Sequence, residues 1–93
     1  MKIEYDPDKN QWNINNRSLS FEQATDLDWN TAQIIEDVRK DYPEPRFVAV
    51  ASLNGRLHIL CFTPVHGGIR VISFRKANTR EIKRYEQATI ERQ

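Results

Sequence analysis

The sequence predicts an α+β domain with an antiparallel sheet, two helices near the N-terminus and one helix at the C-terminus. Three observations lead to this fold class. Two apolar runs, at residues 46–53 and 56–63, flank an Asn-Gly pair, which is a strong signal for a β-hairpin. Two helix-start signals follow one another within residues 6–23, and a third begins at residue 78. Strands grouped between terminal helices are typical of α+β domains.

The chain is short enough to form one domain over residues 1–93. It has 93 residues, of which 39% are hydrophobic and 29% are charged, as in an ordinary globular protein. No apolar run is long enough to span a membrane, so we expect no membrane partner. The first residues are charged and lack the apolar centre of a secretory signal, which favours a cytoplasmic location.

The N-terminal segment begins with a predicted strand at residues 2–5. Asp6 then offers an N-cap carboxylate, and Pro7 suits the first position of a helix. We therefore expect a helix from this point through about Asn15.

A second helix start lies at Ser20. Gln23 stands three residues later, as in a capping box, and Leu19 is placed to pack against Ala24. This helix should end near residues 29–30.

Residues 31–74 have the character of a sheet. A strand is expected at residues 31–36, while the prolines of residues 41–45 exclude regular structure there. The hairpin of residues 46–63 follows, and a further strand covers residues 69–74 after a loop. Because these strands are almost continuously apolar, much of the sheet should be covered on both faces.

The C-terminal helix should begin after Asn78, with Glu81 reaching back to complete a capping box. Helical spacing gives this helix an apolar side that should face the sheet, formed by Ile82, Tyr85 and Thr89. The opposite, solvent-facing side carries Arg80, Lys83 and Arg84.

Charge is unevenly distributed, although the chain is nearly neutral at +1. Residues 22–44 contain seven acids and two cations, whereas residues 70–84 contain six cations and one acid. For Lys83 and Arg84, on an exposed helix, solvation and ligand binding are about equally good explanations. Arg70 and Arg75 bracket an apolar strand segment, where clustered guanidinium groups suit bidentate contacts to phosphate. The basic cluster therefore predicts a polyanionic ligand.

The residues that most often support catalysis or metal binding are few. Cys61 lies in an apolar run, as buried unreactive thiols do, and one cysteine cannot form a disulfide framework. His58 lies within a predicted strand and is expected to be a core residue, while His66 lies in a Gly-rich loop. No His, Cys or acid spacing matches a metal site, so we expect neither a metal nor another cofactor.

Four stretches resemble one protein family. These are IEYDPDKNQWNI at the start, SFEQA, the hairpin EPRFVAVASLNGRLHILCFT and the closing RVISFRKANTREIKRYE. Together they resemble the BrnT-type toxins of type II toxin-antitoxin systems, a branch of the RelE-like ribonucleases. The similarity covers nearly all of residues 1–86, and the closing stretch is its most specific part.

The resemblance implies a RelE-like fold and a ribonuclease that inhibits translation, cleaves RNA without a metal and is neutralised by an antitoxin. The antitoxin would be a small DNA-binding protein that forms a hetero-oligomer with the toxin. Catalysis would require cations that stabilise the phosphorane-like transition state. The catalytic candidates are Arg46, Arg70, Arg75 and Arg80, with Arg75 the first choice. The substrate-binding candidates are Arg17, Lys76, Lys83 and Arg84.

Two positions differ from the family pattern. Asn16-Arg17 stands where the family usually has Lys-His, so the expected imidazole acid or base is missing, and Phe74 replaces a small residue. A catalytically degenerate toxin homologue that acts as an antitoxin-binding or co-repressor subunit therefore stays open. The basic cluster alone leaves a further alternative, a small RNA-binding module.

Overall fold

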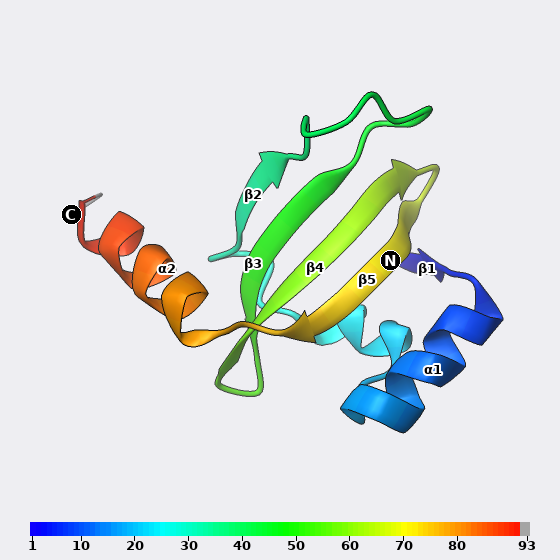
Figure 1. The fold of residues 1–93 in the computed structure, drawn as a ribbon, viewed down its shortest axis with the longest axis horizontal. Helices are drawn as coiled ribbons and strands as arrows, with labels where there is room; N and C mark the ends of the chain where they lie inside the picture. The colour runs from blue at the N-terminus through cyan, green and yellow to red at the C-terminus, as the bar shows by residue number, and fades with distance from the viewer. Residues whose placement is uncertain (92–93) are drawn as a thin grey trace.

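The computed structural model describes the backbone of residues 1–91 and the side chains of residues 1–90. It confirms a mixed α+β architecture with a five-stranded sheet in the order β1-β5-β4-β3-β2 (Figure 1). The strands are β1 (Lys2–Glu4), β2 (Gln33–Glu36), β3 (Phe47–Leu53), β4 (Arg56–Val65) and β5 (Gly68–Lys76). The helices are α1 (Pro7–Arg17), the 3₁₀ helix η1 (Phe21–Asp26) and α2 (Thr79–Glu91).

The expectation of a purely antiparallel sheet is wrong at one edge. Strands β2 to β5 are antiparallel neighbours, but β1 pairs in parallel with the first residues of β5, with Ile3 opposite Ile69. At Gly68 a Cβ atom would collide with the Lys2 carbonyl group, so this close pairing needs a glycine. Strand β1 pairs only with residues 68–70 of β5. Further along β5, α1 takes the place of a neighbouring strand, and its Asn13 and Arg17 side chains donate to the Phe74 carbonyl (Figure 1).

The two N-terminal helices begin where the sequence predicts. Asp6 accepts a hydrogen bond from the Asp8 amide, and Pro7 is the first residue of α1. Ser20 and Gln23 form the expected capping box. The helix that follows is a single 3₁₀ segment that ends at Asp26, earlier than expected. The indole of Trp29 donates to the Ala24 carbonyl at 3.0 Å, which fixes the extended residues after η1.

The strands on either side of the turn at residues 66–67 are longer than the sequence predicts, because β4 continues to Val65 and β5 starts at Gly68. The other turn, Asn54-Gly55, has the positive φ angles of a tight hairpin, at 51° and 82°, as predicted. A bulge at Ile72 shifts the β4–β5 register, so Phe62 pairs with Val71 while Cys61 pairs with Ser73.

This bulge decides which side chains share a face. Arg70 and Arg75 are five residues apart, which would place them on opposite faces of a regular strand. Their partners on β4 are Thr63 and Ile59, four residues apart and therefore on the same face. The extra residue at Ile72 thus brings Arg70 and Arg75 to one face of the sheet.

One face of the sheet, which we call the covered face, packs against η1 and its flanking residues. The buried core includes Phe21, Leu60 and Phe74 together with the small side chains of Ala49 and Ala51. The opposite side, which we call the open face, carries Val48, Val50, Cys61 and Ile72, all of which keep part of their surface in solvent. The expectation that both faces are covered is therefore wrong.

Helix α2 begins as predicted but does not pack over the sheet. Asn78 and Glu81 form a reciprocal capping box, with both hydrogen bonds at 2.9 Å. Tyr85 donates to the Thr31 carbonyl at 2.9 Å, so the helix lies beside the residues that precede β2 and projects away from the core (Figure 1). Ile82 and Tyr85 are half-buried. Thr89 is exposed, so the expectation that it faces the sheet is wrong.

Candidate active site on the open face of the sheet

The open face forms a hollow of about 420 Å³ between the sheet and the first turns of α2, which we call the open-face hollow. Its floor is mainly apolar and comes from strands β2 to β5: Gln33, Ile35, Val48, Val50, Ile59, Cys61, Ile72 and Ser73. Its rim carries four guanidinium groups and two carboxylates: Asp37, Arg39, Arg46, Arg75, Glu81 and Arg84. An apolar floor with a charged rim is a common arrangement in ligand sites.

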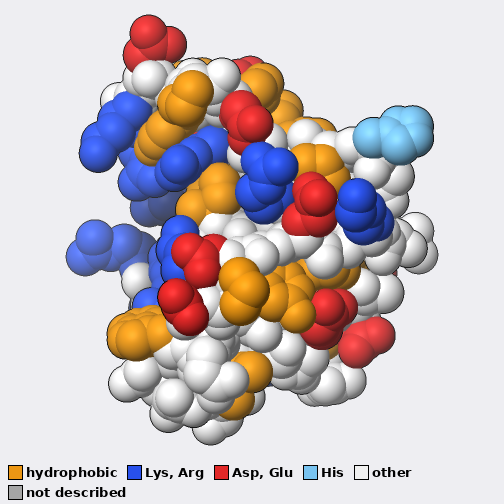
Figure 2. All heavy atoms as spheres, turned by 90° about the vertical axis from the view of Figure 1, so that its right-hand side faces the viewer, with side chains coloured by type: hydrophobic (Ala, Val, Ile, Leu, Met, Phe, Trp, Pro, Cys, Tyr) orange, Lys and Arg blue, Asp and Glu red, His pale blue; other side chains and the backbone are white. Residues whose placement is uncertain are grey.

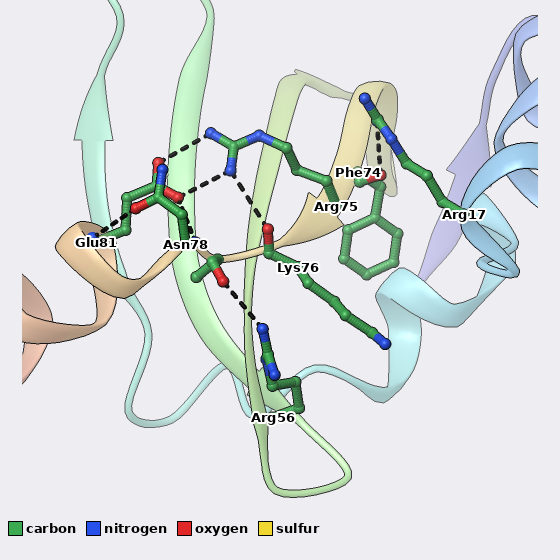
Figure 3. A network of polar contacts seen from close by, with 8 residues as sticks. Arg17, Arg56, Phe74, Arg75, Lys76, Asn78 and Glu81 are labelled. Carbon is green, nitrogen blue, oxygen red and sulfur yellow. Dashed lines mark hydrogen bonds and ion pairs between the residues drawn. The ribbon is translucent and has the colours of Figure 1, made fainter.

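Arg75 is the most firmly held cation of this rim. Its two terminal nitrogens donate to the two Glu81 carboxylate oxygens at 2.8 and 2.9 Å, and Nη1 also donates to the Lys76 carbonyl at 3.3 Å. Figure 3 shows Arg75 reaching from the end of β5 towards Glu81 on α2. The hydrogen bonds from Arg75 hold the pKa of Glu81 at about 2, and the same pair raises the pKa of Arg75.

Asp37 and Arg39 form a second charged pair at the end of β2. The Asp37 side chain is only 2% exposed and accepts two hydrogen bonds of 2.8 Å from the Arg39 guanidinium. These bonds hold the pKa of Asp37 well below its ordinary value. Tyr42 donates to the same carboxylate, and the Arg46 guanidinium lies 4.1 Å from the centre of the Tyr42 ring. The segment between β2 and β3 therefore anchors Arg46 at the rim.

Arg70 lies at the far end of the open face. Its guanidinium contacts Glu44 at 2.9 Å and Glu4 at 3.7 Å. A smaller hollow beside it is also lined by Arg46 and Ile72, which belong to the open-face hollow as well. A continuous surface therefore runs from Arg70 through these two residues towards Arg75.

Arg17 and Lys76 belong to a second group of cations, at the edge of β5 next to α1. Arg17 donates to the Phe74 carbonyl at 3.2 Å and to the Asn13 side chain at 3.1 Å. A separate hollow is lined by Arg17, Lys76 and Arg75. Figure 3 shows Arg75 reaching from β5 towards α2, whereas Arg17 reaches from the α1 side to the Phe74 carbonyl. Arg75 lines both the open-face hollow and the hollow beside Arg17, so this edge and the open face meet at Arg75.

The three cations of α2 do not share one environment. Arg84 lines the open-face hollow, whereas Arg80 and Lys83 are exposed on the helix and are not among the residues that line it. Figure 2 shows Lys and Arg side chains, in blue, gathered at the left of the view. Across the middle of the same view, cations alternate with Asp and Glu side chains, in red. The basic run of residues 70–84 is thus divided over several surfaces.

The histidines are placed as the sequence predicts, but Cys61 is more exposed than the buried thiol that it predicts. His58 is buried on the covered face, its Nδ1 lies 2.7 Å from the Arg56 carbonyl oxygen, and burial lowers its pKa. His66 is exposed in the turn between β4 and β5. Cys61 is half-buried on the open face, and burial raises the pKa of its thiol. Neither imidazole lines the open-face hollow.

Within the described residues, no group of three or more His, Cys, Asp and Glu side chains is placed to hold a metal ion. No helix of the described residues is both long and apolar enough to cross a bilayer.

Sequence reasoning missed two members of the site. Arg39 is one of only two cations in the acidic stretch of residues 22–44, and nothing in the sequence marks it as a site residue. In the structure it lies with Arg46 at the rim of the open-face hollow. Glu81 was expected only to cap α2, and its contact with Arg75 was not foreseen. A signal for the second contact was available, because an acid at the third position of a helix that starts just after a strand lies near the end of that strand.

The fold and the hollow define a small α+β protein that presents guanidinium groups on an open sheet face. Residues 5–81 match the family model described as "Ribonuclease toxin, BrnT, of type II toxin-antitoxin system". The match covers far more than half of the chain, so the chain belongs to the BrnT toxin family. A type II toxin-antitoxin family implies an antitoxin partner. No curated protein matches the chain at a significant level.

Proposed function

We propose that this protein is an endoribonuclease toxin that inhibits translation in the cytoplasm and cleaves RNA at the open-face hollow. The observation that carries the proposal is the convergence of Arg39, Arg46, Arg75 and Arg84 on the rim of this hollow, in a chain that belongs to a ribonuclease toxin family. Guanidinium groups bind phosphate in a bidentate manner, and several together neutralise the charge of a phosphodiester.

The proposed reaction uses the RNA as its own nucleophile. The 2′-hydroxyl loses its proton and attacks the adjacent phosphorus, the bond from phosphorus to the 5′-oxygen breaks, and that oxygen takes up a proton. The products are a 2′,3′-cyclic phosphate and a free 5′-hydroxyl. The pentacoordinate transition state concentrates negative charge on the phosphoryl oxygens, where fixed cations lower its energy most.

Arg75 is the proposed principal stabiliser of this charge. A guanidinium has five N–H donors, and the contacts to Glu81 and the Lys76 carbonyl occupy three of them. The Nε donor and one donor on Nη2 are left, and they lie on the same edge of the guanidinium. That edge can bind two phosphoryl oxygens while Glu81 holds the opposite end in place.

Glu81 acts in this proposal as a positioning residue and not as a base. Its pKa of about 2 makes it a weak proton acceptor, and its oxygens are already bonded to Arg75 and to the Asn78 amide. Since Glu81 also caps α2, the carboxylate couples the orientation of Arg75 to the start of the helix. A preorganised cation needs little rearrangement when the transition state forms.

The other candidate cations would bind the flanking phosphates. Arg46 stands at the rim and is supported by Tyr42, while Arg70 extends the charged surface along β5. Lys76 and Arg17 lie at the edge of β5, and Arg84 is on the α2 side of the hollow. The proposed catalytic role of Arg80 and the substrate role of Lys83 require RNA that extends past the hollow onto the exposed side of α2.

A second function is favoured by Arg17, which occupies the position where the family usually has histidine. No histidine lines the open-face hollow, and a guanidinium does not exchange protons near neutral pH. Under this alternative the chain binds its antitoxin and has lost cleavage. Expression of the chain alone separates the two functions, because only an active toxin arrests growth.

The decisive test is cleavage of an oligoribonucleotide by the purified chain in excess EDTA. Metal-independent transesterification predicts cleavage that EDTA leaves unchanged, and products that end in a cyclic phosphate. Replacing each 2′-hydroxyl by hydrogen should abolish cleavage, since the nucleophile is removed. Cleavage of the deoxy substrate, or loss of activity in EDTA that Mg²⁺ restores, would contradict the proposed reaction.

The antitoxin is proposed to be a small DNA-binding protein that forms a hetero-oligomer with this chain and neutralises it by covering the cations. Arg70, Arg75, Lys76 and Arg80 are the proposed contacts, because an acidic segment bound there would also exclude RNA. Electrostatic steering should then make the association rate fall steeply with added salt. Stopped-flow association across a salt series tests this, and a salt-insensitive rate would place the antitoxin on another surface.

A further inference from the structure

Trp12 is an exposed aromatic side chain that neither the core nor the open-face hollow uses. It lies on α1, and the residue is 53% exposed. The Arg17 guanidinium lies 5.0 Å from the centre of its ring, which holds the indole at the surface. By contrast, Trp29 packs edge-on against Phe62 in the core and donates to a backbone carbonyl. Only Trp12 is therefore placed to meet a ligand.

Beside Trp12 is a mainly apolar hollow of about 420 Å³, which we call the Trp12 hollow. It is bounded by Trp12, Lys9 and Arg17 on the α1 side and by Ile72 and Ser73 on the β5 side. Both β5 residues also line the open-face hollow, so the two hollows meet at the bulge of β5. A chain bound in one hollow can continue directly into the other.

The charges around this edge are of one sign. The cations Lys9 and Arg17 line the Trp12 hollow, and Arg17, Arg75 and Lys76 line the hollow next to it. No carboxylate is among the residues that line either of these two hollows. The open-face hollow differs, since Asp37 and Glu81 share its rim. An aromatic ring beside the cations Lys9 and Arg17, next to the proposed phosphate site, suits a nucleotide better than an acid-containing or purely apolar partner.

We propose that Trp12 is a stacking platform for an RNA base next to the scissile phosphate, with Lys9 and Arg17 binding the neighbouring phosphates. The proposal rests on the proposed ribonuclease function and specifies how its substrate is held. Arg17 has two roles in this proposal. Its guanidinium lies over the indole of Trp12, and its Nη1 donates at 3.2 Å to the carbonyl of Phe74, the residue before Arg75. The stacked base and the reacting phosphate are thereby linked through one side chain.

The two tryptophans make the proposal directly measurable. A Trp29→Phe variant leaves Trp12 as the sole indole while keeping an aromatic ring in the core. The probe is a 2′-O-methyl oligoribonucleotide, which cannot undergo attack by its 2′-oxygen. A base stacked on Trp12 should quench its fluorescence in a saturable manner. An abasic oligonucleotide of the same length carries the phosphates without the bases, and it should leave the fluorescence almost unchanged.

The matched variants are Trp12→Ala and Trp12→Phe in the parent chain. Stacking on an aromatic side chain contributes on the order of 1–3 kcal/mol per base, so Trp12→Ala should weaken oligonucleotide binding by about 5- to 150-fold. Cleavage at subsaturating RNA should fall by a similar factor. Trp12→Phe should retain most of both, since it keeps a ring at this position.

The outcomes separate this inference from the function on which it rests. Normal cleavage and binding by Trp12→Ala would overturn the stacking role while leaving the ribonuclease proposal intact. Equal quenching by the abasic oligonucleotide would also overturn it, because the phosphates alone would be responsible. Quenching by the antitoxin but not by RNA would identify Trp12 as a protein contact and reject the inference. Failure of the parent chain to cleave would refute the ribonuclease proposal, whereas base-dependent quenching would still support stacking.

Discussion

The two faces of the sheet are built from the same strands but have different tasks. On the covered face, Ala49, Leu60 and Phe74 are fully buried against η1, and packing there stabilises the fold. On the open face, Val48 and Cys61 keep part of their surface in solvent beside Arg46 and Arg75. Partial exposure of the open face leaves a hollow lined by cations, which the proposed function uses to bind RNA.

The sharpest form of the comparison involves Phe74 and Arg75, neighbours in sequence that point to opposite faces (Figure 3). Phe74→Ala should lower the free energy of unfolding by about 3–5 kcal/mol, because it opens a cavity at a fully buried position. Urea titration measures the change. If the alanine variant does not fold, Phe74→Leu should fold with a smaller loss. A loss below about 1 kcal/mol would mean that the covered face is not the stabilising one.

Arg75→Ala should have the opposite profile. We expect RNA cleavage to fall by about 100-fold or more, equivalent to about 3 kcal/mol of transition-state stabilisation. The free energy of unfolding should change by less than about 1 kcal/mol, because the lost ion pair is partly exposed. Lys2→Ala removes a cation on the edge strand β1, opposite the start of β5, while Arg75 lies near the end of β5. This variant serves as a control and should cleave normally. Equal rates in the two variants would remove Arg75 from the site.

Glu81→Gln tests whether cleavage requires the Arg75 guanidinium to be held in place by Glu81. Cleavage should fall by about tenfold, since the neutral amide holds the guanidinium less firmly. Glu86→Gln, on the exposed side of the same helix, should leave the rate unchanged. A Glu81→Gln variant as active as the parent would show that Arg75 needs no support from α2.

Glu81→Gln should also change how the free energy of unfolding depends on pH. Because the pKa of Glu81 is lowered to about 2 in the folded protein, its pairing stabilises the protein above the unfolded value of about 4.3. That contribution, about 1 kcal/mol after allowing for solvent screening, should disappear as the pH falls from about 4.3 to 2. Urea titrations at several pH values should show this decline in the parent and a correspondingly smaller decline in Glu81→Gln.

The smallest expected effect concerns the missing imidazole. No residue lining the open-face hollow ordinarily titrates between pH 5 and 8, so the parent cleavage rate should rise with pH across this range. Arg17→His should raise the rate at pH 7 and add a bend near the ordinary pKa of imidazole, about 6.5. Arg17→Gln is the control for loss of the guanidinium. Identical pH profiles for the two variants would mean that residue 17 cannot serve as an acid or base.

Local signals in the sequence predicted the starts of the elements well. Asn54-Gly55 defines the hairpin, and the capping boxes at Ser20 and Asn78 mark the starts of two helices. Each of these depends on residues within a few positions of one another. The parallel pairing of β1 with β5 depends on residues more than sixty positions apart, which no local pattern reveals.

The site was harder to predict than the fold for a related reason. Strict alternation would put Arg70 and Arg75 on opposite faces, and the bulge at Ile72 is what brings them together. Helical spacing gave α2 an apolar side but could not show that α2 lies beside Thr31 and Gln33 at the edge of the sheet and not over its face. The open face therefore arises from a bulge and from a helix that packs beside the sheet.

The central claim is that RNA binds the open face, and methyl NMR tests it most directly. The chain would be labelled at Ile, Leu and Val methyl groups and titrated with the 2′-O-methyl oligoribonucleotide. If RNA binds the open face, chemical shifts should change mainly for the methyls that line its hollow, namely Ile35, Val48, Val50, Ile59 and Ile72. Methyls of the covered face, namely Leu53, Leu60, Ile69 and Val71, should change little. Larger changes on the covered face, or on α2 alone, would contradict the account.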